Sequence, residues 1–319
     1  MGNRRRRRRL RVVCTQELAI RAEQQRLEEH FDVVVSTENL AADLATADGA
    51  IIIVPARADE DLLRDAPRLR ALATVSSGTD HIHLETLAAR GIRLISGSGS
   101  APAPVAEWVA WAALSLRRQL HQAAKLQEAG VGWIDAHQEP PPGLGSATLG
   151  LIGFGRTGQH VHRYLAPFVG RTLTLTRSPR GLPSGCEHVA DVTDLCMRSD
   201  IVSLHVPLTD QTHGLLGETQ LRAIGPEGVL INAARGAVVD QQALLACLQD
   251  GSLGAAAIDC YEPEPPDPGF VRDLASTGRA LLTPHIAGFT RDGLETLCRV
   301  AVDGLIDALL TDPPDGRQG

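Results

Sequence analysis

Aromatic side chains are scarce in this chain: Phe, Tyr and Trp make up 3% of its 319 residues, whereas hydrophobic residues as a whole make up 43%. With so few rings, the core must consist mainly of Ala, Val, Leu and Ile, a composition that suits parallel strands covered by helices. Long apolar runs are also missing. The longest, at 105–116, is interrupted by Glu107 and is too short to span a membrane. The sequence therefore indicates a globular protein with a buried helix at this position.

Cysteine pairs are missing as well. The six cysteines are scattered along the chain without a C-x-x-C pair, so neither a disulfide framework nor a metal site is expected. Unpaired cysteines are typical of a reducing compartment, and we expect a cytoplasmic location.

The chain has no excess of positive charge. Its formal net charge is −7, from 31 basic and 38 acidic residues, which argues against nucleic acid as the main partner. Six of the basic residues form the run Arg4–Arg9; the remaining 25 against 38 acidic residues leave a charge of −13. The run is suited to tethering nucleic acid or a membrane. No apolar or aromatic pattern accompanies it, so a solvated terminus is favoured, and no apolar region of secretory-signal length follows it.

Short apolar stretches alternate with helical patterns along most of the chain. This alternation implies right-handed crossovers and parallel sheets. The length suits two domains. We expect residues 1–100 to form the first and residues 101–286 the second, with a loop or hinge at 97–104. A final amphipathic helix at 293–310 would return to the first domain, which would then also contain residues 287–319. Strands are expected at 10–14, 32–35, 49–54, 72–75, 92–95, 148–152, 172–176, 201–206, 229–233, 255–258 and 280–283; helices at 16–30, 84–90, 159–165, 218–224, 241–249 and from 105 onward.

The second domain begins with a dinucleotide fingerprint, G-x-G-x-x-G, which follows the strand at 148–152 and precedes a helical pattern. Gly153 permits the tight turn, Gly155 lets the backbone approach a pyrophosphate, and Gly158 lets the helix pack close to the strand. Free N–H groups at the start of that helix would face the phosphates. A plain glycine loop is the alternative, and the strand and helix around the motif make it the less favoured one.

The strand at 172–176 ends without the carboxylate that usually binds the ribose hydroxyls of NAD. Arg177 stands in its place, with Ser178 and Arg180 close behind. Two guanidinium groups and a hydroxyl are suited to a 2′-phosphate, so NADP is favoured over NAD. The competing interpretation is that these arginines stack on adenine or face solvent.

Several further motifs resemble those of the D-isomer-specific 2-hydroxyacid dehydrogenases. The longest are V-L-I-N-A-A-R-G at 229–236, I-D-C-Y-E-P-E-P at 258–265 and L-T-P-H-I-A-G at 282–288; shorter ones lie at 77–82, 105–107 and 206–212. The resemblance covers nearly the whole chain. It implies an α/β protein with two doubly wound parallel-sheet domains, a Rossmann-type cofactor domain and a flavodoxin-like substrate domain, with a cleft between them.

The resemblance assigns catalysis to Arg235, Glu264 and His285. Arg235 would pair with the carboxylate of a 2-keto acid and polarise the adjacent carbonyl. His285 would give a proton to the carbonyl oxygen as hydride arrives, and take it back in oxidation. Glu264 would hold the imidazole and raise its pKa. Glu262 lies close by, but Glu264 is the residue five positions past Asp259, as in the family pattern.

The same resemblance implies the remaining contacts. In the first domain, N–H groups of Ser76, Ser77 and Gly78 would bind the substrate carboxylate. Asp259 corresponds to the family's acid near the nicotinamide carboxamide. The other cofactor contacts implied are Arg156, Thr157, Val206, Pro207, Thr212, Ala233, Ala234, Arg235, His285 and Gly288. Asn residues that the family often has at the positions of Ser96 and Ala101 are missing here, which affects substrate recognition.

The expected function is hydride transfer between NADP(H), or NAD(H), and a small 2-hydroxy or 2-keto acid, as in glyoxylate/hydroxypyruvate-type reductases. A homodimer formed through the helix after Val105 is expected, with no membrane partner. One alternative is a non-catalytic nucleotide-sensing module or corepressor-like protein. A lesser one is an erythronate-4-phosphate dehydrogenase-like enzyme, resembled at 78–82 and 283–293, although the sequence ends at Gly319 without that subfamily's extra C-terminal dimerisation domain.

Overall fold

Two parallel β-sheets organise the chain in the computed structural model, which describes residues 8–130 and 140–311. One compact unit comprises residues 1–101 and 290–319, and the other comprises residues 102–289. The chain returns from the second unit to the first at Thr290, three residues later than expected. The reason is that Ala287 is buried in an apolar cluster of the second unit. Most of the predicted arginine run (residues 4–7) lies outside the described residues.

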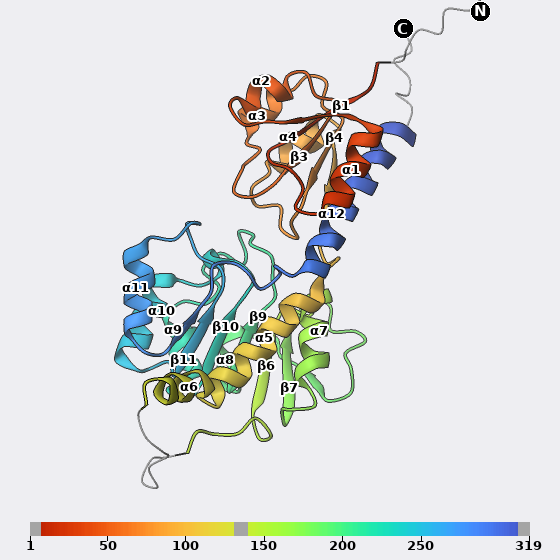
Figure 1. Cartoon of the computed structure of the whole chain (residues 1–319). Helices are drawn as coiled ribbons and strands as arrows, with labels where there is room; N and C mark the ends of the chain where they lie inside the picture. Colours follow the sequence, from red (N-terminus) through yellow and green to blue (C-terminus); the bar gives the residue numbers. More distant parts are fainter. Residues whose placement is uncertain (1–7, 131–139, 312–319) are drawn as a thin grey trace, which may run out of the picture. The chain divides into compact units, whose positions relative to one another are not determined.

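The first unit contains a five-stranded sheet in the order β2-β1-β3-β4-β5, all parallel (Figure 1). This is the flavodoxin-like order. Helices cover both faces and enclose two separate apolar clusters. The strands are β1 (Arg11–Cys14), β2 (Asp32–Val35), β3 (Gly49–Ile52), β4 (Ala71–Thr74) and β5 (Arg93–Ser96); the helices are α1 (Arg21–His30), α2 (Leu40–Leu44), α3 (Glu60–Arg64), α4 (Leu84–Ala89), α12 (Arg291–Ile306) and the π-helical turn η2 (Asp307–Thr311).

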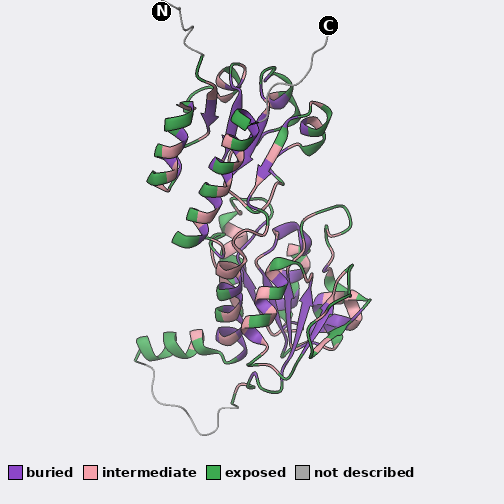
Figure 2. Cartoon of the chain, turned by 90° about the vertical axis from the view of Figure 1, so that its right-hand side faces the viewer, coloured by how far each residue is buried: buried purple, intermediate pink, exposed green. Residues whose placement is uncertain are grey.

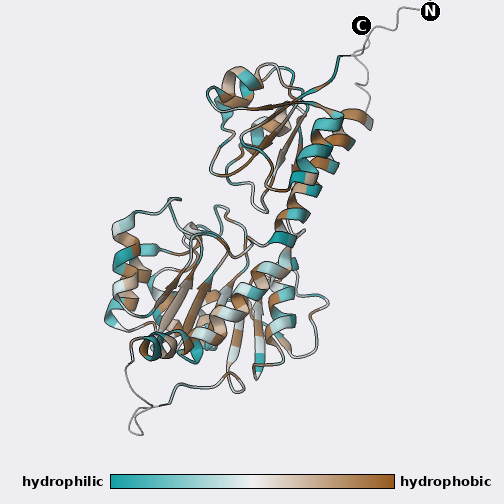
Figure 3. Cartoon of the chain, viewed as in Figure 1, coloured by the Kyte–Doolittle hydropathy of each residue, from teal (hydrophilic) through white to brown (hydrophobic). Residues whose placement is uncertain are grey.

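The helix from the end of the sequence packs beside α1, as Figure 1 shows. It contributes Cys298, Val302 and Leu305 to the same cluster as Leu27 of α1. The first unit is therefore built from both ends of the chain. In Figure 3 the strands are hydrophobic along most of their length, whereas the helices alternate between hydrophobic and hydrophilic residues. This is the pattern of amphipathic helices packed on a buried sheet.

The second unit contains a seven-stranded parallel sheet in the order β12-β11-β10-β9-β6-β7-β8. The chain starts in the middle at β6, builds outward through β7 and β8, and then returns to build the other half. Figure 2 shows that these strands are mostly buried. The strands are β6 (Thr148–Ile152), β7 (Arg171–Leu175), β8 (Cys186–His188), β9 (Ile201–Leu204), β10 (Val229–Asn232), β11 (Ala255–Ile258) and β12 (Ala280–Leu282).

Helices cover both faces of this sheet and enclose two large apolar clusters. Strand order reverses between β6 and β9, and ligands of such sheets bind outside the carboxyl ends of the strands at that switch point. The predicted fold class, two parallel α/β units with a Rossmann-type sheet in one, is confirmed. The helices are α5 (Pro102–Arg117), α6 (Leu120–Glu128), α7 (Arg156–Leu165), α8 (Val192–Met197), α9 (Glu218–Ile224), α10 (Gln241–Asp250), α11 (Pro268–Ser276) and the 3-10 turn η1 (Gly236–Val238).

Some element boundaries differ from the sequence-based expectation. Helix α1 begins at Arg21 rather than residue 16, because the Gln24 side chain accepts a hydrogen bond from the Leu18 N–H and the preceding segment folds back on the helix start. Helix α5 begins at Pro102, inside the predicted loop, since proline is well suited to the first turn of a helix. None of the helices in the described ranges is long and apolar enough to cross a membrane.

Candidate active site

Most of the predicted site residues lie on loops that leave the carboxyl ends of the second sheet. The glycine motif follows β6, and Arg177 follows β7. Arg235 follows β10, Glu264 follows β11, and His285 follows β12. Because all these strands are parallel, their carboxyl ends meet at one edge of the sheet. Pro207 and Thr212 lie on the loop after β9, where the Thr212 hydroxyl donates to the Pro207 carbonyl at 2.6 Å.

The glycine turn has a geometry that only glycine fits. Gly153 has φ +98°, and a Cβ atom there would lie 2.4 Å from the His205 carbonyl oxygen. A Cβ at Gly158 would lie 2.3 Å from the Gly153 carbonyl oxygen. At Gly155, by contrast, a Cβ would meet nothing within 4 Å, and this N-cap of α7 has no side-chain capping bond. The first and last glycines are therefore needed for packing, whereas the middle one leaves an open approach to a helix N-terminus, which fits a pyrophosphate.

The loop after β7 is exposed and positively charged. Arg177, Ser178 and Arg180 are all exposed, and in the described part of the chain neither guanidinium has an ion-pair partner. Ser178 and Arg180 line a cavity of about 400 Å³ together with His160 and Arg163 of α7. Arg177 does not line this cavity. The loop after β7, the neighbour of β6, thus carries the basic groups that the sequence predicts.

A buried asparagine, which sequence reasoning did not single out, shapes the turn that carries Arg235. Asn232 is 1% exposed; its amide donates to the Arg235 carbonyl at 2.9 Å and its oxygen accepts from the Ala234 N–H at 3.0 Å. The signal available in the sequence was a polar residue at the end of an apolar strand. Asn232 therefore fixes the backbone of Ala233, Ala234 and Arg235.

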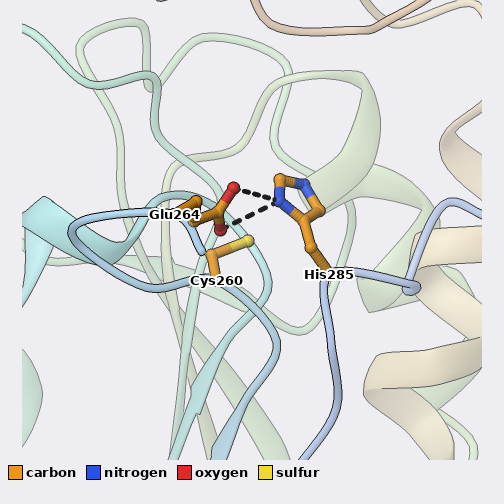
Figure 4. A group of neighbouring side chains, drawn as sticks. All are labelled: Cys260, Glu264 and His285. Carbon is orange, nitrogen blue, oxygen red and sulfur yellow. Dashed lines mark hydrogen bonds and ion pairs between the residues drawn. The ribbon is translucent and has the colours of Figure 1, made fainter. Parts of the chain in front are cut away.

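His285 and Glu264 form a close pair. The Nδ1 atom of His285 lies 2.9 and 2.8 Å from the two carboxylate oxygens of Glu264 (Figure 4). Glu264 also accepts from the Tyr261 N–H at 3.0 Å, which orients the carboxylate. The two side chains are 46% and 32% exposed, so both remain accessible from solvent. Because Nδ1 of His285 contacts the carboxylate, Nε2 is the ring nitrogen that can exchange a proton with a substrate.

The electrostatics of this pair favour a charged imidazole. Contacts with the Cys260 sulfur and with the Glu264 carboxylate raise the pKa of His285 to about 10, although burial opposes the shift. Burial also disfavours the ionised form of Glu264, but the hydrogen bonds from His285 and Tyr261 and the charge of Arg235 outweigh it and lower the pKa of Glu264. Because burial raises the pKa of Cys260, that residue is a neutral thiol near pH 7. The negative charge beside the imidazolium is therefore that of Glu264.

Asp259 holds the loop that carries His285. Its fully buried carboxylate accepts from the Thr283 hydroxyl at 2.5 Å and from the N–H groups of Ile286 and Ala287 at 2.8 Å each. The Asp259 carbonyl also accepts from the His285 N–H at 2.8 Å. His285 has φ +54°, a left-handed conformation that costs on the order of 1–3 kcal/mol for a residue with a side chain. Three hydrogen bonds to a carboxylate, at about 1.5–3 kcal/mol each, outweigh that cost.

Arg235 lies close enough for its charge to act on both Glu264 and Cys260. The reason is close packing at the next residue. A Cβ at Gly236 would lie 2.1 Å from the Tyr261 carbonyl carbon, so the Arg235 turn lies directly against the start of the loop that carries Glu264. The structure thus brings Arg235, Glu264 and His285 together from three separate loops.

Ser76, Ser77 and Gly78 lie in the first unit, on the loop after β4. The Ser76 hydroxyl donates to the Gly78 carbonyl at 2.6 Å, and Thr74 contacts both the Ser76 hydroxyl and the ring of His81, at 3.0 and 2.9 Å. Thr74 and His81 are buried. The loop is therefore held in shape by hydrogen bonds of its own side chains and of Thr74.

Comparison with known proteins agrees with this arrangement. Residues 110–287 match the model of the NAD-binding domain of D-isomer-specific 2-hydroxyacid dehydrogenases. A glyoxylate/hydroxypyruvate reductase B of Klebsiella pneumoniae is 34% identical over 308 residues, covering 89% of this chain and 91% of its own.

Two solved structures are also similar. One is an NADPH-dependent glyoxylate/hydroxypyruvate reductase of Sinorhizobium meliloti in complex with NADP and malonate (29% identity, TM-score 0.85, 95% of each chain). The other is D-lactate dehydrogenase of Aquifex aeolicus complexed with NAD and lactic acid (26% identity, TM-score 0.86, 93% of this chain and 94% of that one). The family model, the sequence relatives and the similar folds all agree with the motifs from which the site is built. The chain therefore belongs to the D-isomer-specific 2-hydroxyacid dehydrogenases.

Proposed function

We propose that this enzyme is an NADP(H)-preferring reductase of a small 2-keto acid of the glyoxylate or hydroxypyruvate type. As a member of its family it is an oxidoreductase that moves a hydride between a nicotinamide cofactor and a 2-hydroxy or 2-keto acid. The observation that carries the proposal is the His285–Glu264 pair, with Arg235 beside it, at the carboxyl edge of a sheet whose glycine turn fits a pyrophosphate.

The three side chains have complementary tasks in this proposal. The guanidinium of Arg235 pairs with the substrate carboxylate and polarises the adjacent carbonyl. His285, protonated near pH 7, gives its Nε2 proton to the carbonyl oxygen, and Glu264 holds the ring and balances its charge. The bound nicotinamide supplies or accepts the hydride. We further propose that N–H groups of Ser76, Ser77 and Gly78 bind the substrate carboxylate.

The proposed direction follows from the charge on His285. Reduction of a keto acid needs an imidazolium that can donate a proton, and oxidation of a hydroxy acid needs a neutral imidazole that can accept one. Because its pKa is raised to about 10, His285 is mostly in the donating form at neutral pH. Reduction is therefore the favoured direction there.

The proposed preference for NADP rests on the loop after β7. Two exposed arginines and a serine stand where an NAD-specific enzyme has a carboxylate that would repel a 2′-phosphate. The relatives include both a structure with NADP and one with NAD. The cofactor contacts proposed for this chain remain those of the glycine turn, the loops after β7, β9 and β10, Asp259, His285 and Gly288.

The test is a panel of acids assayed with each cofactor in turn. Purified full-length protein is mixed with NADPH or NADH and with glyoxylate, hydroxypyruvate, pyruvate or 4-phosphoerythronate, the last with the oxidised cofactors. We expect the fastest oxidation of NADPH with glyoxylate or hydroxypyruvate. Tight NADPH binding without turnover of any acid would favour the nucleotide-sensing alternative, and activity confined to 4-phosphoerythronate would favour the erythronate-4-phosphate dehydrogenase-like one.

We also propose a homodimer, formed through α5 and α6. Helix α6 has no buried residue, and its Leu120 and Leu126 are 47% and 49% exposed. Trp111 of α5 is 44% exposed. Apolar side chains gathered on neighbouring helices are typical of an interface. Analytical ultracentrifugation should give twice the chain mass; a monomer at all concentrations would contradict the proposal. A cytoplasmic location is proposed on the ground that the six cysteines are all free.

A further inference from the structure

We propose that Cys260, Glu264 and His285 form an inhibitory binding site for Zn²⁺. Their ligand atoms all lie within 4.8 Å of one another. Figure 4 shows the thiol, the carboxylate and the imidazole converging on one point. The proposal concerns regulation of the active site described above. The inhibition rests on the proposed function, whereas the metal binding does not.

The set of donors favours a borderline-soft cation. Thiolate, imidazole and carboxylate are the three side-chain types that bind Zn²⁺, and a catalytic or accessible site commonly has three protein ligands with water in the fourth position. Zn²⁺ forms bonds of about 2.0–2.3 Å to such atoms, which brings the ligand atoms to within about 4 Å of one another. Hard cations such as Mg²⁺ and Ca²⁺ prefer oxygen ligands and do not suit a thiol.

The surroundings allow the ligands to close on an ion. Glu264 and His285 are partly exposed, so their side chains are accessible to an ion from solvent and have room to rotate by the small amount required. Cys260 is 1% exposed and forms the floor of the site, where its thiol contacts the Ala234 carbonyl at 3.5 Å. On binding, the thiol and the imidazolium each lose a proton to solvent, and the metal–ligand bonds replace the Glu264–His285 hydrogen bond.

Two charges act on this site in opposite senses. The carboxylate of Glu264 attracts a cation, whereas the nearby charge of Arg235 repels one and favours the Cys260 thiolate. The inferred site is consequently one for a strongly binding ion such as Zn²⁺. An ion bound to Nδ1 of His285 replaces the Nδ1 proton, so the ring is no longer an imidazolium that can give up its Nε2 proton, and it also takes up the carboxylate that orients the ring. Metal binding and turnover should therefore exclude each other.

Cobalt provides a readout that does not depend on activity. Co²⁺ occupies zinc sites and gives a sulfur-to-cobalt charge-transfer band in the near ultraviolet when a thiolate is a ligand. Full-length, untagged protein is stripped with a chelator and titrated with Co²⁺, as wild type and as Cys260→Val, Cys260→Ser and Cys186→Ser. The last is the matched control, because Cys186 also lies beside a histidine, with Sγ 3.5 Å from Nδ1 of His162.

We expect the band in the wild type and in Cys186→Ser, and its loss in both Cys260 variants. NADPH binding by each variant shows that it is folded, and Cys260→Ser keeps the size of the side chain if the valine variant fails that check. A wild type without the band, or a band of equal strength in Cys260→Ser, overturns the metal site. Competition by Zn²⁺ should remove the band in proportion to the zinc added.

The activity arm separates the two proposals. Low concentrations of Zn²⁺ should inhibit the wild type, with recovery on addition of a chelator. Groups that only orient a ligand are worth about 10- to 100-fold in metal affinity, so loss of the thiolate should raise the inhibitory concentration at least as much, relative to each variant's own metal-free rate. A band without inhibition overturns the regulation alone. A band in a protein that turns over no acid overturns the proposed function and leaves the metal site standing.

Discussion

The two ends of the active-site edge are built by different means. On the side of β11 and β12, buried hydrogen bonds fix the proton donor: Asp259 accepts from three donors of the loop that carries His285. On the side of β6 and β7, backbone packing fixes the glycine turn, but the arginines that would select the cofactor are exposed and without ion partners among the described residues. The acid–base chemistry is thus preorganised within the fold, whereas cofactor choice depends on a few exposed side chains.

The strongest test of this comparison is His285→Gln. Glutamine keeps a polar group of similar size but cannot donate and regain a proton, and a positioned general acid contributes roughly 10²- to 10⁴-fold to a rate. We expect kcat for keto-acid reduction to fall by about that factor, while fluorescence titration still shows NADPH binding. His188→Gln, an exposed histidine on β8, is the control. Full turnover by His285→Gln would end the assignment of the proton donor.

Asp259→Asn tests whether buried hydrogen bonds fix the donor. The amide oxygen can still accept from Thr283 and Ile286, but the amide NH₂ would face the Ala287 N–H, so one hydrogen bond is replaced by a repulsion. A loss of about 1.5–3 kcal/mol corresponds to a fall in kcat of roughly 10- to 100-fold. The pH profile of reduction should also shift to lower pH, because a loosened His285 is held less well by Glu264.

Asp191→Asn is the matched control for that variant. Asp191 caps α8 by accepting from the Asp194 N–H, and asparagine caps helices equally well. It should leave both kcat and the pH profile unchanged. An Asp259→Asn enzyme with the wild-type profile would show that the loop keeps its shape without the carboxylate.

Replacing Arg177 and Arg180 together by serine tests the exposed end. Each charge-assisted contact to a 2′-phosphate is worth about 1.5–3 kcal/mol, so loss of one lowers the ratio of kcat/KM with NADPH to that with NADH roughly 10- to 100-fold, and loss of both should lower it by at least that factor. The rate with NADH should change little, since the acid–base side is untouched. Arg299→Ser, an exposed arginine of α12, is the control. An unchanged ratio would mean that the two arginines face solvent only.

The smallest expected effect is the pH dependence of the wild type. With the pKa of His285 raised to about 10, the proton needed for reduction is present through neutral pH and is lost as the pH rises through that value. The kcat/KM for reduction should therefore be independent of pH near pH 7 and should decline at alkaline pH. The kcat/KM for oxidation should rise over the same alkaline range. In Glu264→Gln the decline should begin at lower pH, because the carboxylate no longer favours the imidazolium. Steady-state kcat/KM measured as a function of pH in both reaction directions tests these expectations.

Local patterns predicted most of the fold. The glycine motif, the strand periodicity and the motifs around Arg235, Glu264 and His285 are contiguous in sequence, so their chemistry and their place at strand ends can be inferred without coordinates. The short strand β8 escaped prediction because it is three residues long and mostly exposed. Helix α5 begins earlier than its prolines suggest, because proline is common in loops but also fits a first helical turn.

Long-range contacts were the part that the sequence did not reveal. Asp259 resembles a cofactor contact, but its hydrogen bonds join it to residues 24 to 28 positions away, which no local pattern encodes. The hydrogen bonds of Asn232, by contrast, are local, to Ala234 and Arg235, but they depend on a turn geometry that the motif around Arg235 does not specify. The approach of Cys260 to His285 depends on how two loops meet, and a scattered cysteine gives no sign of it.

The proton donor is attached to one of the two short edge strands of its sheet. Strand β12 has three residues, pairs on one side only and is half-buried, whereas the glycine turn follows the fully buried central strand β6. Edge segments open locally at a lower free energy than the core does. In mild denaturant, turnover should therefore disappear while the protein still binds nucleotide and keeps its circular dichroism: the enzyme would lose its chemistry before it loses its shape.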